Sequence, residues 1–244
     1  MKSGLVLLTL LALGACERSP GPTPASAPAA KPPAAAPDLA PNLSQAFHLA
    51  FGRAAPARRT VTEGETSSVY IYDPARLIPM DGGMALVSTA RNLSDCHLCA
   101  GALAVHYLKR GPGGAWTVSG AWPELAFGNG FGAPPDWEVR QFGQRRFIQA
   151  EAGWTGQGYT CSSATLIELG PDTVAVRAVV PVHYDNEGAV GEGEAATVID
   201  GRIESGPDGK LRVTYEGTKS GVVDYARSGE RYAPVSGPVG IADC

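Results

Sequence analysis

Residues 159–182, YTCSSATLIELGPDTVAVRAVVPV, contain two apolar runs separated by a turn. The runs, 159–169 and 173–182, are rich in Val, Ile and Thr, whose branched side chains favour extended backbone. Gly170-Pro171-Asp172 between them has the composition of a turn. The stretch therefore predicts two consecutive β-strands and indicates a β-rich chain.

The same pattern recurs along the chain beyond Arg59, with turns rich in Gly, Pro and Asp between the runs. The other predicted strands are 69–72, 84–89, 100–109, 115–119, 147–152, 196–204, 211–215 and 222–225. None alternates with a helix of roughly 10 to 15 residues, which disfavours parallel βαβ layers. We therefore expect an all-β fold, a mostly antiparallel sandwich or barrel, whose strand order the sequence does not fix.

One helical pattern precedes the strands, because apolar residues recur at intervals of three and four along 43–51. Asn42 or Ser44 can cap its start, and Gly52 lies near its end. We expect one short helix at the beginning of a single domain, residues 42–244. Its length of about 203 residues suits one large all-β domain.

The segment before this domain differs in composition. Pro and Ala make up 16 of the 25 residues from Glu17 to Pro41, and Leu39 is the only large apolar residue. Such a segment cannot bury enough apolar surface to offset the entropy of ordering it, and its prolines favour extended backbone. We expect residues 16–41 to form a disordered tether.

The first sixteen residues combine a basic start, a short apolar run and small residues before Cys16, which is typical of a secretory signal. The run from Leu5 to Leu13 is too short to span a bilayer. Leu13-Gly14-Ala15-Cys16 resembles the lipobox of bacterial lipoproteins. This resemblance, confined to the segment, implies a signal peptide at 1–15 and lipidation of Cys16. It also implies an outer-membrane anchor facing the periplasm or cell surface, because Glu17 replaces the Asp that retains lipoproteins at the inner membrane.

The charge of the chain bears on its partners. Its 20 Lys and Arg are outnumbered by 24 Asp and Glu, a formal net charge of −4. Nothing in this balance indicates binding to nucleic acid or anionic lipid through a basic surface. The expected partners are the membrane, through the N-terminal lipid, and an envelope protein or glycan.

Four cysteines remain beyond the lipidated one: Cys96, Cys99, Cys161 and Cys244. An even number in an exported chain indicates two disulfides, with three possible connectivities. A Cys161–Cys244 bridge would contribute roughly 4.5 kcal/mol and a Cys96–Cys99 bridge about 2 kcal/mol. We favour this pairing because it also holds the last residue, and the other two connectivities stay open.

Cys96-His97-Leu98-Cys99 also fits a thiol-redox or metal-handling site, which is the alternative function. Against redox activity, the residues that follow are strand-like, whereas thioredoxin-like sites place the first cysteine at a helix N-terminus. Asp95 would also raise a neighbouring thiol pKa. Zinc would need Cys161 and a further ligand from His97, His106 or His183, in a compartment that oxidises thiols. We expect no metal and no cofactor.

Six aromatic residues surround a Gly- and Pro-rich stretch at 127–135. Four of them are candidate binding residues: Phe127, Phe131, Trp137 and Trp154. Exposed rings on a rigid loop bury a large area with few rotatable bonds, although the same rings could instead close the end of the core.

The sequence shows no convincing catalytic motif. No GxSxG motif is present. Paired carboxylates for glycoside chemistry cannot be located without a fold: Asp136 and Glu151 lie near aromatic residues, but so do many surface acids. The acidic run that includes Asp185, Glu192 and Glu194 lacks EF-hand spacing and fits a solvated loop better than a Ca²⁺ site. We therefore expect an envelope-anchored lipoprotein with a non-catalytic β-rich domain that binds a protein or glycan.

Overall fold

The computed structural model describes residues 40–64, 66–94 and 96–235. They belong to one compact unit, Ala40–Cys244. The signal segment, Cys16, nearly all of the predicted tether and Cys244 lie outside the described residues.

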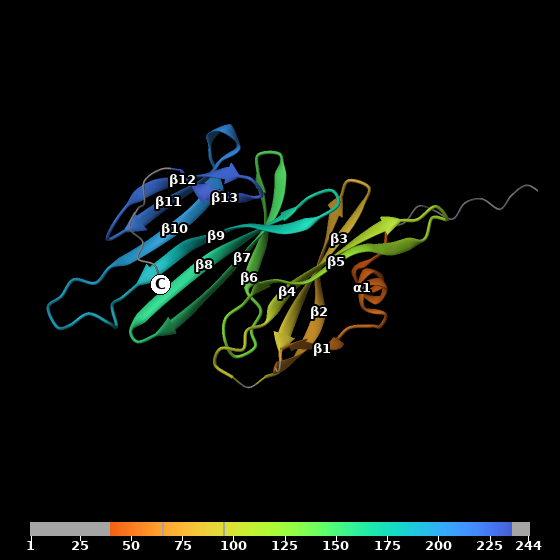
Figure 1. The fold of residues 1–244 in the computed structure, drawn as a ribbon, viewed down its shortest axis with the longest axis horizontal. Helices are drawn as coiled ribbons and strands as arrows, with labels where there is room; N and C mark the ends of the chain where they lie inside the picture. The colour runs from red at the N-terminus through yellow and green to blue at the C-terminus, as the bar shows by residue number, and fades with distance from the viewer. Residues whose placement is uncertain (1–39, 65, 95, 236–244) are drawn as a thin grey trace, which may run out of the picture. The chain divides into compact units, whose positions relative to one another are not determined.

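The described chain contains one α-helix followed by strands (Figure 1). The elements are α1 (Leu43–Phe51), β1 (Ala57–Glu63), β2 (Thr66–Met80), β3 (Gly83–Asn92), β4 (Ala102–Arg110), β5 (Trp116–Phe127), β6 (Asp136–Phe142), β7 (Arg145–Gly156), β8 (Tyr159–Leu169), β9 (Val174–Asp185), β10 (Val198–Ser205), a 3₁₀ turn (Pro207–Gly209), β11 (Leu211–Gly217), β12 (Gly221–Ser228) and β13 (Arg231–Pro234). The prediction of a mostly antiparallel all-β fold with one short helix is confirmed.

Helix α1 begins and ends where local signals place it. The Asn42 side chain accepts a hydrogen bond from the Gln45 backbone N–H (2.9 Å), and the Gln45 side chain accepts one from the Asn42 N–H (3.0 Å). This reciprocal capping box satisfies two backbone donors at the helix start. Gly52 ends the helix in the left-handed conformation with φ of 71°, which glycine adopts at little cost.

The strands form two antiparallel sheets in which sequence neighbours are also spatial neighbours. One sheet has the order β1-β2-β3-β4-β5, and the other has the order β13-β12-β11-β10-β9-β8-β7-β6. All ten predicted strands are present. Strands β1, β6 and β13 were not predicted; each lies at a sheet edge, where one side lacks a neighbouring strand and the burial that produces a clear apolar pattern is incomplete.

Three clusters of buried apolar residues cover the faces of the two sheets. Helix α1 covers one face of the five-stranded sheet through Phe47, Tyr72 and their neighbours. The other face of that sheet packs on the eight-stranded sheet through a cluster that includes Val105 and Ile148. The third cluster, which includes Phe147, lines the opposite face of the eight-stranded sheet. Strand β7 is therefore buried on both faces at residues 147–150, and the two sheets form a sandwich.

The eight-stranded sheet curls on itself. Strands β6 and β10 are four positions apart in the sheet order, yet the Arg140 guanidinium donates a hydrogen bond to the Ile203 carbonyl oxygen at 3.0 Å. This curl encloses the third cluster. Among the described residues, no helix is both long and apolar enough to cross a membrane.

Candidate functional site

An open groove of about 910 Å³ lies where two loops meet the β7–β8 hairpin. We call residues 96–99 the CHLC loop and residues 128–135, between β5 and β6, the aromatic loop. The described residues that line the groove are His97, Leu98, Ala100, Gly128, Asn129, Gly130, Phe131, Asp136, Glu151, Ala152, Gly153, Trp154, Thr155, Gly156, Thr160 and Ser162.

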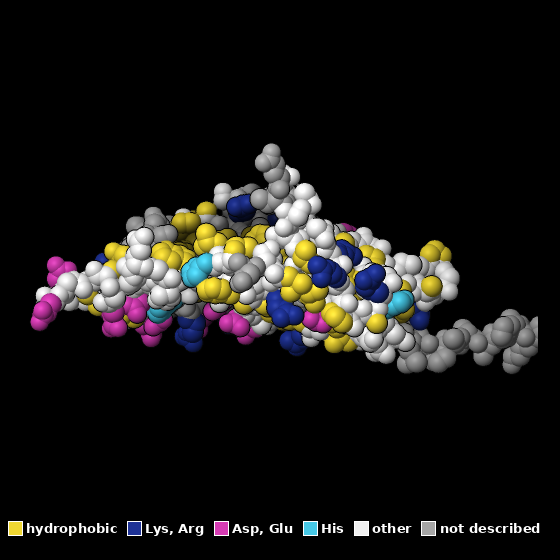
Figure 2. All heavy atoms as spheres, turned by 90° about the horizontal axis from the view of Figure 1, so that it is seen from below, with side chains coloured by type: hydrophobic (Ala, Val, Ile, Leu, Met, Phe, Trp, Pro, Cys, Tyr) yellow, Lys and Arg dark blue, Asp and Glu magenta, His cyan; other side chains and the backbone are white. Residues whose placement is uncertain are grey.

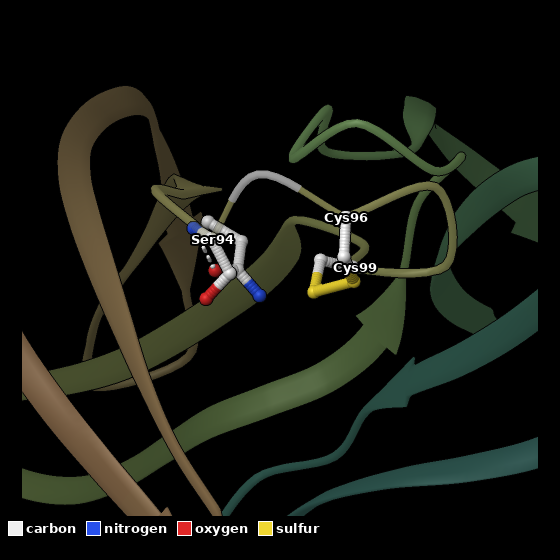
Figure 3. Close-up of a disulfide and its surroundings, with 4 residues drawn as sticks. Ser94, Cys96 and Cys99 are labelled. Atoms are coloured by element: carbon white, nitrogen blue, oxygen red, sulfur yellow. Dashed lines mark hydrogen bonds between the residues drawn. A yellow bond between two sulfur atoms is a disulfide. The ribbon is translucent and has the colours of Figure 1, made fainter.

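The CHLC loop is closed by a disulfide between Cys96 and Cys99, whose Cα atoms are 5.1 Å apart (Figure 3). The Cys99 N–H donates to the Cys96 carbonyl oxygen at 3.1 Å, which completes a tight turn. Just before the loop, the Ser94 N–H donates to the Asn92 side chain at 2.9 Å. The Cys96–Cys99 disulfide agrees with the connectivity favoured from the sequence. Cys161 is buried and is also a disulfide cysteine, whereas Cys244, its predicted partner, lies outside the described residues.

The aromatic loop packs backbone to backbone against the CHLC loop. The Gly132 N–H donates to the Cys99 carbonyl oxygen at 2.6 Å, and the Gly132 carbonyl accepts from the Asn92 N–H at 3.1 Å. A Cβ atom on Gly130 would overlap the His97 carbonyl oxygen, so the two chains approach as closely as glycine allows. The CHLC loop therefore holds the aromatic loop through direct backbone contact.

A side chain fastens the other end of the aromatic loop to the sheet. The Asn129 Oδ1 atom accepts a hydrogen bond from the Gly153 backbone N–H of β7 at 2.7 Å. The Gly128 N–H donates to the Gly101 carbonyl oxygen at 2.9 Å, and the Gly101 N–H donates to the Ala133 carbonyl oxygen at 2.8 Å. The loop is thus held at three places by segments distant in sequence.

Two exposed rings stand at the groove. Phe131 has φ of 59°, a left-handed conformation that is uncommon for a bulky residue, and its side chain is 71% exposed. Its ring packs edge-on against His97, with centroids 4.6 Å apart. Trp154 of β7 is 50% exposed and lies over Gly156, where a Cβ would come within 3.1 Å of the indole ring. The left-handed backbone at Phe131 thus holds an apolar ring toward solvent.

The structure divides the predicted aromatic residues between groove and core. Phe131 and Trp154 line the groove, and Phe127 is exposed at the end of β5 outside the described lining. Trp137 is partly buried against the core cluster between the sheets, as is Trp122. Trp116 packs against the cluster beneath α1. Some of the predicted rings are therefore exposed at the groove, and others belong to the core.

Two carboxylates face each other in the groove. Asp136 of β6 and Glu151 of β7 are direct register partners, so both side chains lie on the same face. Both are exposed, and Glu151 accepts a hydrogen bond from the Gln149 side-chain amide at 2.6 Å. No Lys or Arg occurs among the described lining residues. Sequence reasoning noted both carboxylates, but only the register of β6, an unpredicted strand, brings them together.

The histidines considered as metal ligands lie in different places. His97 lines the groove, and His183 contacts Asp200 with 2.7 Å between Nδ1 and Oδ1. His106 is buried beneath α1 against Phe51, and burial followed by the charge of Arg59 lowers its pKa to about 4. Within the described parts of the chain, no group of three or more His, Cys, Asp or Glu residues is placed to hold a metal ion.

The fold and site together define an antiparallel β-sandwich with an acidic, ring-lined groove. Comparisons of the chain with protein families, curated proteins and solved structures found no match.

Proposed function

We propose that this protein is an envelope-anchored lipoprotein whose β-sandwich is a non-catalytic binding domain. The groove is its binding site for a protein or glycan of the envelope. The observation that carries the proposal is the pair of exposed rings, Phe131 and Trp154, in one groove whose aromatic loop is held by the CHLC loop and by β7.

The supports matter because a binding surface gains affinity when its groups are already held in place. Phe131 is fixed through its packed neighbour His97 and the hydrogen bond from Gly132 to Cys99. A partner that covers these rings then gains their apolar burial without the entropic cost of ordering the loop. Aromatic anchors of this kind dominate the binding energy of many interfaces.

The anchoring part of the proposal rests on the lipobox resemblance at residues 13–16. Replacement of the acylated thiol by Cys16→Ser should release the protein from membranes when cells are fractionated. The membrane-bound fraction of the variant is the measurement, and unchanged membrane association would contradict the anchor.

The binding part can be tested with the immobilised domain and solubilised envelope material. Phe131→Ala and Trp154→Ala should each reduce the retained material, while the melting temperature changes little because both rings are exposed. Val222→Ala is the matched control, since Val222 is 47% exposed on β12 and outside the described groove lining. Retention that falls after protease treatment identifies a protein partner, and retention that survives protease identifies a glycan. Equal retention by the ring variants and the control would refute the groove as the site.

The alternative is a thiol-redox function of the Cys96–Cys99 pair. One observation favours it: Cys96 is exposed, and the residues between the two cysteines line the groove. The alternative requires the disulfide to open and close in the folded protein. Resistance to dithiothreitol, measured by thiol alkylation under native conditions, would exclude it.

A further inference from the structure

The groove is negatively charged, and this charge favours some partners of the proposed binding domain over others. Its described lining carries two carboxylates, Asp136 and Glu151, and no Lys or Arg. We infer that the groove binds an extended protein segment bearing Lys or Arg side chains. This inference rests on the proposed function and names the class of its partner.

The carboxylates provide the first argument. Residues directly opposite in antiparallel strands have Cα atoms about 4.5–5.5 Å apart, and like charges there destabilise the sheet. Asp136 and Glu151 occupy such positions on β6 and β7. An ammonium or guanidinium group placed between them would relieve the repulsion and form charge-assisted hydrogen bonds. A neutral sugar supplies hydrogen bonds but not this relief of charge.

The rings provide the second argument. Lys and Arg side chains combine a charged head with an apolar stem that packs along aromatic surfaces. Phe131 and Trp154 expose such surfaces beside the carboxylates, and a cation over either ring face is attracted by its π electrons. The groove therefore offers both a place for the stem and a place for the charge.

The surroundings of the groove extend the same charge. The turn of the β7–β8 hairpin packs on the loop between β9 and β10, because a Cβ on Gly158 would overlap the Gly188 backbone. That loop carries Glu187, Glu192 and Glu194. Acidic side chains gather at the left of Figure 2, where this loop lies in Figure 1. Such a field steers a basic partner toward the groove and disfavours anionic glycans and phosphate-bearing lipids.

The size of the groove indicates a segment rather than a single amine. Its volume of about 910 Å³ lies near the upper end of the roughly 300–1,000 Å³ of small-molecule pockets, and it is open to solvent. A stretch of several residues in extended conformation fills such a space, with alternate side chains facing the groove.

The test uses the full β domain with three fluorescent probes: a short peptide of alternating Lys and Ser, the same peptide with Glu for Lys, and a neutral chito-oligosaccharide. Fluorescence anisotropy at physiological ionic strength, where the Debye length is about 8 Å, should show binding of the Lys peptide alone. The double variant Asp136→Asn with Glu151→Gln should weaken that binding by about tenfold or more, because two charge-assisted contacts are lost. Asp136→Asn alone should give a smaller loss of binding in the same direction. This single variant keeps the test informative if the double variant does not fold.

The matched control is the double variant Glu192→Gln with Glu194→Gln, which removes the same charge from the neighbouring loop. It should weaken binding less than about threefold, since these charges act at long range through salt-screened solvent. Equal losses from the two double variants would overturn the inference by showing that attraction is diffuse. Binding of the oligosaccharide in preference to the Lys peptide would overturn it while leaving the proposed function intact. If the wild-type domain binds neither the Lys peptide nor envelope material, both the inference and the proposed function are refuted.

Discussion

The aromatic loop and the acidic loop, residues 186–195, are both glycine-containing surface connections, yet they are held in opposite ways. The aromatic loop receives hydrogen bonds from segments far away in sequence, such as Cys99 and Gly153. The described bonds of the acidic loop are local: Glu187 N–H donates to Asp185, and Gly191 N–H donates to Glu194.

This difference separates a loop that is built into the fold from one that only closes a turn. Long-range bonds fix the position of the aromatic loop relative to the sheets, so its exposed ring keeps one place in the folded protein. Local hydrogen bonds shape the acidic loop; it meets the β7–β8 turn where Gly188 lies against Gly158, but no described hydrogen bond ties its carboxylates to a sheet. A loop whose ring is held in place is suited to recognise a partner, and a loop of solvated charges is suited to attract one.

The largest expected effect comes from matched glycine substitutions in the two loops. Both Gly132 and Gly193 have positive φ, 77° and 84°, so Ala at either position meets backbone strain of about 1–2 kcal/mol. At Gly132 the new Cβ also overlaps the Asn92 carbonyl oxygen, whereas nothing lies within 4 Å at Gly193. We expect Gly132→Ala to lower the free energy of unfolding by roughly 3–4 kcal/mol and Gly193→Ala by about 1 kcal/mol. Urea denaturation of both variants measures the difference, and similar losses would show that the two loops are equally free.

Acid pH probes a third region, the core beneath α1, where His106 is buried. Burial lowers the pKa of His106 to about 4 from 6.5, so the unfolded chain takes up this proton more readily than the folded protein does. Stability should therefore fall as the pH drops from about 6.5 to about 4, by about 3 kcal/mol from this residue.

The measurement is the free energy of unfolding across this pH range in the wild type and in His106→Leu. Neither His106 ring nitrogen has a hydrogen-bond partner among the described residues, so Leu leaves no buried donor or acceptor behind. The variant should have a flatter profile. Parallel profiles in the two proteins would contradict this role for His106.

Removal of the Cys96–Cys99 disulfide should loosen the aromatic loop and leave the acidic loop unchanged. The double variant Cys96→Ser with Cys99→Ser should lose about 2 kcal/mol of stability, since the bridge closes only a short loop. Because Cys99 accepts the hydrogen bond from Gly132, the Gly132 amide should also exchange with solvent faster. The amides of Ala189 and Glu194 in the acidic loop are the internal controls. Faster exchange at all three amides would mean general loosening of the domain.

The parts of the fold that depend on neighbours in sequence could be predicted, and those that depend on distant neighbours could not. Helix α1 was predicted because Asn42 and Gly52 mark its ends by local chemistry. Strand β1 was missed because Arg58 and Arg59 interrupt any apolar pattern, and it forms by pairing with β2 at a sheet edge.

The same distinction holds for the candidate site. Phe131 and Trp154 could be named from the sequence because aromatic residues in a Gly- and Pro-rich context are conspicuous. The pairing of Asp136 with Glu151 depends on the register of β6 and β7, which no local signal specifies. The contact between His97 and Gly130 likewise joins two loops that only the assembled sheets bring together.

The smallest expected effect on stability comes from replacing one asparagine in each of the two loops. Asn129 accepts from the Gly153 N–H at 2.7 Å, which joins the aromatic loop to β7, and Asn186 accepts from the Thr197 N–H at 2.6 Å, which only closes the base of the acidic loop. Either substitution by Ala should cost about 1 kcal/mol of stability, because each removes one hydrogen bond. Binding should distinguish them: Asn129→Ala should weaken retention of envelope material several-fold, whereas Asn186→Ala should leave it unchanged. Comparable retention by both variants would mean that the exposed rings bind without the bond that joins Asn129 to β7.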